Sequence, residues 1–165
     1  MKKRVRSITA ANFTPFGQYL SFPPPKSTKP TIAVPKVIDY WKQQAVFDSS
    51  MKIEIGALTV YDREHAFCEI ERHRRTPELL VILDAEVAIP CAPPHKPMRK
   101  GDVPASTDIE VFKVPAGSAV LFPVGGWHWA PYPTTTKKVN ILVVFRDNTS
   151  QDDLEIVELA EEVTF

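Results

Sequence analysis

The segment from Gly117 to His128 (GSAVLFPVGGWH) places one histidine behind a short apolar run, a proline and two glycines. An apolar run of this length is typical of a buried strand, and Pro123 ends it. Gly125 and Gly126 permit a tight turn with positive φ. The segment therefore predicts a strand and a hairpin turn that deliver His128 to a defined position.

A second polar group lies earlier, in AFCEIERHRRTPELLVI (66–82). Glu71 and His73 are two residues apart in a strand-like run, so they project from one face, and a hairpin would bring Glu78 close to them. Burying two carboxylates with an imidazole is costly unless something pairs them, and a divalent metal commonly does so. The alternatives are a hydrogen-bonded His73 at a strand end and a Glu78 that pairs with a nearby arginine.

The composition predicts one globular domain over residues 1–165. Twenty basic and twenty acidic residues cancel, which gives no reason to expect nucleic acid or an anionic membrane as partner. The basic first residues precede no long apolar run, so we expect neither a signal peptide nor a membrane span. We therefore expect a cytoplasmic location.

The distribution of proline and β-branched residues predicts an all-β chain. We expect an N-terminal arm over residues 1–50 and a barrel core over residues 51–150. The arm would hold a proline-rich loop (22–35) and one short helix (35–47) with its apolar residues on one face. The tail LEIVEL (154–159) fits either an edge strand or a helix.

Two motifs resemble the signatures of the cupin superfamily. Gly117 to His128 matches G-x5-P-x-G-x2-H at every position, and Glu71-x-His73-x4-Glu78-x6-Ala85 is similar to H-x-H-x3–4-E-x6-G, with Glu71 for the first histidine and Ala85 for the glycine. The resemblance implies a jelly roll, or double-stranded β-helix barrel, with one or two short peripheral helices. It also implies that His73, Glu78 and His128 bind a divalent metal (Ni, Zn, Mn or Fe(II)), with Glu71 as a fourth ligand or a base.

A longer series of segments resembles the ureidoglycolate lyase family: ITAANFTPFGQYL, IERH, VFKVPAGSAVLFPVGGWHWAPYP and FRDN…LEIVEL. This resemblance implies a metal-dependent homodimer that cleaves ureidoglycolate to glyoxylate and urea in allantoin and purine catabolism. Arg74 stands where the family has proline, Glu78 where many members have glutamine, and Arg146-Asp-Asn where it has Arg-Gly-Gly.

Residue roles follow from these resemblances. Glu71, His73 and His128 would be catalytic, while Arg72, Trp127 and Arg146 would bind the small-molecule substrate. Strand alternation points Arg72 away from His73, so an outward ion pair is the alternative for Arg72, and core packing is the alternative for Trp127. Two other functions stay open: another cupin enzyme, such as an isomerase or oxygenase acting on a small hydroxy or keto acid, and a non-catalytic cupin that binds a small ligand.

Overall fold

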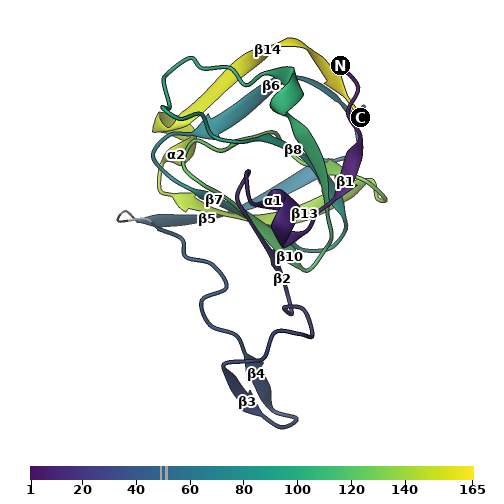
Figure 1. Cartoon of the computed structure of the whole chain (residues 1–165), viewed down its shortest axis with the longest axis vertical. Helices are drawn as coiled ribbons and strands as arrows, with labels where there is room; N and C mark the ends of the chain where they lie inside the picture. Colours follow the sequence, from purple (N-terminus) through teal and green to yellow (C-terminus); the bar gives the residue numbers. More distant parts are fainter. Residues whose placement is uncertain (49, 51) are drawn as a thin grey trace.

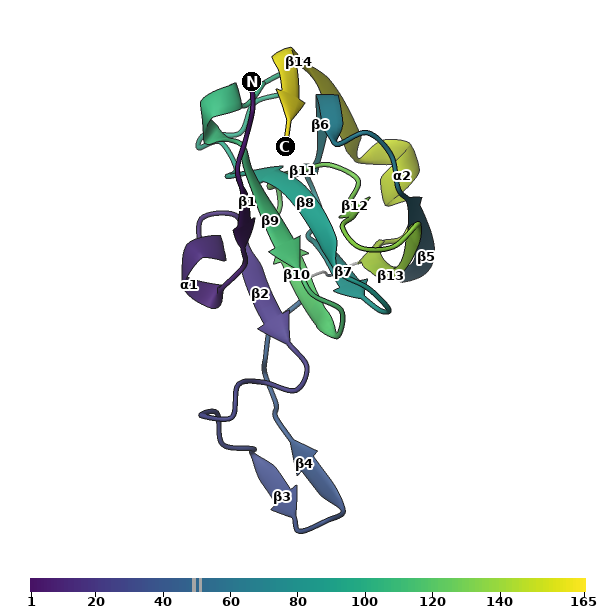
Figure 2. The ribbon, with the colours of Figure 1, turned by 90° about the vertical axis from the view of Figure 1, so that its right-hand side faces the viewer.

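The structure is a computed structural model that describes residues 1–48, 50 and 52–165. The body of the molecule is built on two facing β-sheets, and a thin arm projects from this body (Figures 1 and 2). Residue 51, at the expected start of the barrel core, lies outside the described residues.

The first sheet has the strand order β1-β9-β8-β11-β6-β14, with β12 paired to β8. Its strands are β1 (Val5–Ser7), β6 (Ala66–His73), β8 (Val87–Ala92), β9 (Glu110–Val114), β11 (Trp127–His128), β12 (Tyr132–Pro133) and β14 (Leu154–Thr164).

The second sheet has the order β2-β10-β7-β13-β5. Its strands are β2 (Gln18–Ser21), β5 (Ile53–Tyr61), β7 (Glu78–Ile82), β10 (Ser118–Phe122) and β13 (Lys138–Arg146). The described residues form no strand pair between the two sheets, so the jelly roll is an open sandwich rather than a closed barrel. The all-β jelly-roll class predicted from the sequence is confirmed.

Apolar side chains from both sheets fill the space between them. Ile89 and Phe112 of the first sheet pack in one buried cluster with Leu80, Val120 and Ile141 of the second. A smaller cluster lies on the other face of the first sheet, where Trp127 is fully buried. The first sheet is therefore covered on both faces, which holds β6 and β11 in place.

The predicted helix over residues 35–47 is wrong. This region contains a hairpin of β3 (Ile32–Val34) and β4 (Ile38–Tyr40), followed by irregular chain. The Val37 N–H donates to the Val34 carbonyl, and Lys36 has a φ of 60°. Pro35 is therefore the second residue of a tight turn, where its fixed φ is favourable, and not the first residue of a helix.

The helices that do form are short and lie elsewhere. They are α1 (Ala10–Phe13), α2 (Thr149–Asp152) and a 3-10 turn at Ser106–Asp108. Thr9 and Asn12 form a reciprocal capping box at α1. The tail, for which the sequence allowed either an edge strand or a helix, forms strand β14 at the edge of the first sheet. None of the described helices has the length and apolarity needed to cross a membrane.

Candidate metal centre

Three side chains converge between the sheets, two from neighbouring positions (His73 and Glu78) and one from a distant segment (His128). His73, Glu78 and His128 each present one potential ligand atom, and these atoms lie within 4.8 Å of one another. The residues are 6%, 7% and 3% exposed. Two imidazoles and a carboxylate form a donor set suited to a divalent transition metal.

Two connections that cross from one sheet to the other, β6 to β7 and β10 to β11, produce this convergence. We call these two connections the crossings. His73 ends β6 in the first sheet and Glu78 begins β7 in the second, and β10 and β11 are likewise in different sheets. The connections predicted as hairpins are therefore crossovers. The Gly125 N–H donates to the His73 carbonyl at 2.7 Å and joins the two crossings directly.

Gly125 and Gly126, in the connection from β10 to β11, differ in backbone conformation and in the atoms that surround them. Gly125 has a φ of 78°, and a Cβ there would lie 2.6 Å from the Met98 sulfur. Gly126 does not have the predicted positive φ, but a Cβ on it would approach the Pro123 carbonyl oxygen to 3.1 Å. A side chain at either position would therefore force neighbouring atoms to shift, and Gly125 in addition needs the left-handed conformation.

Backbone contacts orient both imidazoles. His73 Nδ1 lies 3.4 Å from the Asp153 carbonyl oxygen, and His128 Nδ1 lies 3.2 Å from that of Gly126. The Phe122 ring stacks on His128 with centroids 4.6 Å apart. Because a carbonyl accepts from Nδ1–H, the Nε2 atom of each ring is left to face the centre, as a metal ligand must.

The two Nε2 atoms meet at one carboxylate oxygen. Glu78 Oε2 lies 2.5 Å from His128 Nε2 and 3.5 Å from His73 Nε2. Burial favours a neutral Glu78, but the adjacent imidazoles of His128 and His73 outweigh it and hold the Glu78 pKa well below its ordinary value. Burial also opposes charge on His128, yet Glu78 and then Glu71 raise the His128 pKa to about 9.

These groups fit a bound cation. Glu78 Oε2 and His128 Nε2 are buried at ion-pair distance, but neither has a hydrogen-bond partner of suitable geometry. Buried polar atoms are normally hydrogen-bonded, so two such atoms side by side are suited to share a bound cation. A divalent ion in place of the imidazolium proton would satisfy both atoms.

Glu71 lies at the edge of this group. It is the cross-strand partner of His128, and its Oε1 lies 3.6 Å from His128 Nε2. Its side chain is 23% exposed, much more than the three buried residues. Burial raises the Glu71 pKa, while His128 opposes that rise. Glu71 therefore connects the buried group with solvent.

The structure places Arg72 and Trp127 together on the opposite face of the sheet. Arg72 Nε donates to Glu155 at 2.9 Å, and its guanidinium lies 4.2 Å above the Trp127 ring. These contacts correspond to the alternatives to substrate binding, an ion pair for Arg72 and core packing for Trp127. The ion pair of Arg72 is not at the surface, however, because its side chain is fully buried.

Arg146 also lies outside the centre. Its guanidinium pairs with Asp152 and donates to the Asp147 carbonyl at 3.0 Å. The preceding residue, Phe145, is on the inward face, with its ring 6.1 Å from His73. Strand alternation therefore turns the Arg146 side chain away from the centre, although the residue is only 4% exposed.

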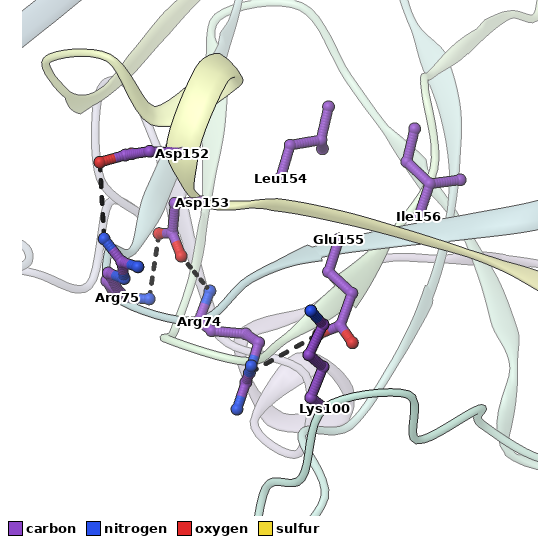
Figure 3. A pocket seen from close by; sticks show the side chains of 8 residues that line it. All are labelled: Arg74, Arg75, Lys100, Asp152, Asp153, Leu154, Glu155 and Ile156. Atoms are coloured by element: carbon purple, nitrogen blue, oxygen red, sulfur yellow. Dashed lines mark hydrogen bonds and ion pairs between the residues drawn. The ribbon is translucent and has the colours of Figure 1, made fainter.

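Asp153 is a positioning residue that the sequence did not indicate. Its carboxylate accepts from the backbone N–H groups of Arg74 (2.9 Å) and Arg75 (3.0 Å), while its carbonyl faces His73. It lies beside a surface cavity of about 520 Å³, where Figure 3 shows it between the two arginines. This contact joins residues 80 positions apart, so no local sequence pattern announces it.

Comparison with protein-family models and with curated proteins gives no match. Among solved structures, the chain is similar to a structure of Bacillus subtilis oxalate decarboxylase that was used to study the Mn(II) centres of that enzyme. The two chains are 17% identical with a TM-score of 0.43, and the match covers 66% of this chain and 24% of that chain. A structure of that enzyme at pH 4.6 gives 16% identity, a TM-score of 0.42, and coverage of 70% and 24%. This chain thus spans about a quarter of the length of those chains.

Proposed function

We propose that the protein is a metal-dependent cupin enzyme whose ion is held by His73, Glu78 and His128. The convergence of three buried donor atoms within 4.8 Å supports this most directly. When bound, a divalent cation would act as a Lewis acid that lowers the pKa of a substrate hydroxyl and offsets carboxylate charge.

We propose further that the reaction is cleavage of ureidoglycolate to glyoxylate and urea. The support is the resemblance of several segments to ureidoglycolate lyases, together with a carboxylate at the edge of the centre. The substrate carries a hydroxyl, a carboxylate and a ureido group on one carbon. Loss of the hydroxyl proton forms the aldehyde C=O as the C–N bond breaks, and the leaving nitrogen takes up one proton.

Glu71 is our candidate for moving that proton. It is partly exposed beside the buried group, and its raised pKa suits a carboxylate that must accept a proton near neutral pH. Because the cleavage consumes no net proton, one carboxyl group can accept the hydroxyl proton and return it to the departing nitrogen. Arg72 and Arg146 already bind Glu155 and Asp152, so we assign neither to the substrate carboxylate.

The test is glyoxylate release from ureidoglycolate by protein loaded separately with Ni, Zn, Mn or Fe(II). We expect turnover with at least one metal, and a loss of about 10²–10⁴-fold in kcat for Glu71→Gln with metal content unchanged. Glu69→Gln, two residues earlier on the same strand, is the matched control. Loss of metal from Glu71→Gln would instead make Glu71 a ligand. Full metal occupancy without glyoxylate from any loaded form would refute the lyase assignment and leave a cupin with another substrate.

A further inference from the structure

Arg72 and Trp127 lie behind the two histidines of the centre, on the outer face of the first sheet. Arg72 precedes His73 in β6, and strand alternation points its side chain away from the centre. Trp127 has the same relation to His128 in β11. Both side chains are fully buried, with the guanidinium 4.2 Å above the indole ring. This stack joins the two strands that carry the histidines, on the face opposite the metal centre.

Irregular chain between β8 and the 3-10 turn, residues 93–105, contacts this stack from outside. The Arg72 guanidinium donates to the Arg99 carbonyl and lies 3.8 Å from the Asp102 carboxylate. The His95 ring packs edge-on against the indole, with ring centroids 6.0 Å apart. We call these residues segment 93–105.

Glu155 on β14 anchors the same segment from the side. It is the cross-strand partner of Arg72 and accepts from its Nε at 2.9 Å. Its second carboxylate oxygen accepts from the Gly101 N–H at 2.6 Å. Lys100, the residue before this glycine, lines the same surface cavity as Glu155 (Figure 3). One guanidinium therefore fixes segment 93–105 both directly and through Glu155.

Burial of the Arg72 guanidinium is costly for a residue that only fills space. Among the described residues, its Nη1 has no hydrogen-bond partner of suitable geometry, although the side chain is 0% exposed. Well-packed apolar side chains often match or exceed the stability that a buried ion pair gives. The guanidinium adds several directional bonds from one planar group, and these bonds fix one position of segment 93–105 on the sheet.

Segment 93–105 in turn contacts the crossing from β10 to β11. Met98 lies against Gly125, since a Cβ built on this glycine would be 2.6 Å from the Met98 sulfur. The Gly125 N–H donates to the His73 carbonyl at 2.7 Å. A continuous series of contacts therefore runs from Arg72 through Met98 and Gly125 to the backbone of His73.

We propose that Arg72 is a positioning residue of the metal centre, which acts through segment 93–105 and Met98. By holding Met98 against Gly125, it keeps the two crossings together and so sets the relative position of the two imidazoles. The role rests on the proposed metal binding but not on the identity of the substrate. It takes the place of the substrate contact that the sequence led us to expect for Arg72.

The test is Co(II) affinity, by competition with a chelator, in folded variants of the full chain. Arg72→Lys keeps the charge but loses the planar donor group, and Met98→Ala removes the contact with Gly125. We expect each substitution to weaken Co(II) binding by about 10–100-fold. We also expect each to change the visible absorption spectrum of the bound ion, because that spectrum depends on ligand geometry.

Arg63→Lys is the matched control. Arg63 also stacks on an aromatic ring, that of Tyr132 at 3.5 Å, and it donates to the carbonyls of Ala130 and Pro131. These partners follow β11 rather than forming a crossing. We expect wild-type affinity and spectrum from Arg63→Lys, even if its stability falls. A purely structural Arg72 would behave in the same way as this control.

The double variant Arg72→Lys/Met98→Ala tests the route. Two side chains that act in one series give a double variant about as weak as the weaker single variant, whereas independent effects multiply. Multiplied losses would therefore overturn the route through Met98. If Arg72→Lys does not fold by circular dichroism, Met98→Ala still decides, because it leaves the buried charge paired. Wild-type affinity and spectrum in the folded single variants would overturn the role of Arg72 alone. A wild type that binds no divalent metal would instead overturn the metal centre itself.

Discussion

At the scale of single residues, backbone carbonyls contact Nδ1 of both His73 and His128, and Nε2 of both rings faces the Glu78 carboxylate. His128 is central, because Glu78 and Glu71 both lie within 3.6 Å of its Nε2. We expect His128→Asn to reduce metal affinity by at least 100-fold while the protein stays folded, since loss of a ligand costs more than loss of an outer partner. Metal analysis after dialysis measures this. His95→Asn is the control, and a His128→Asn protein that retains full occupancy would contradict the ligand assignment.

Asp153 supports the same centre from outside. Its carboxylate accepts two backbone N–H groups of the crossing after β6. We expect Asp153→Ala to lower the free energy of unfolding by about 1–3 kcal/mol, because two N–H groups lose their acceptor. Urea denaturation measures the stability, and metal titration shows whether His73 is displaced, which would weaken binding by about 10–100-fold. Asp153→Asn keeps one acceptor oxygen and should fall between Ala and wild type. Equal stability of all three proteins would exclude this role.

At the scale of elements, the crossings between sheets decide where the ligands meet. Gly125 links the crossings, and its left-handed backbone lies against Met98. Gly101 has nearly the same φ, 80°, with no atom within 4 Å of a Cβ built on it. We expect Gly101→Ala to cost about 1 kcal/mol of stability, the backbone penalty alone, and Gly125→Ala to cost about 2–4 kcal/mol, because a steric clash is added. Thermal unfolding of the two variants gives the comparison. An equal loss in both would show that Met98 moves aside freely.

The arm shows how an element can be misjudged from periodicity. Val37, Ile38, Tyr40 and Trp41 fit one face of a helix, but the pairing of Ile32 with Tyr40 reveals a period of two on either side of a turn. Pro35 is compatible with both forms, since it suits the first turn of a helix and the second position of a tight turn equally. The positive φ of Lys36 and the strand pairing across the turn decide between them.

At the scale of the whole molecule, the buried pair of His128 and Glu78 links stability to pH in the metal-free protein. The folded pKa of His128, about 9, is above the ordinary value of 6.5, so its contribution is complete below pH 6.5 and is lost as the pH rises through 9. That shift corresponds to roughly 3 kcal/mol. The lowered pKa of Glu78 acts in the opposite direction, since its contribution is present above pH 4.5 and is lost on acidification.

We therefore expect chelator-treated protein to be most stable between about pH 5 and 6.5 and to lose stability toward pH 9. Urea denaturation at a series of pH values measures this, and His128→Asn should abolish the loss on the alkaline side. Added metal should flatten the same slope, because binding takes the place of the proton and stabilises the folded state by mass action. A metal-free protein with constant stability from pH 6 to 9 would show that His128 is not charged in the fold.

The sequence by itself determined the all-β class and the apolar strand that ends before Pro123, because period-two patterns, proline and glycine act over short distances. The resemblance to the cupin signatures singled out His73, Glu78 and His128 as candidate donors. Only the tertiary structure decided that both connections are crossovers, that Asp153 holds His73, and that Arg72 and Arg146 bind carboxylates away from the centre. These are contacts between residues far apart in the chain, so their geometry depends on which strands pair and on which face each side chain is buried.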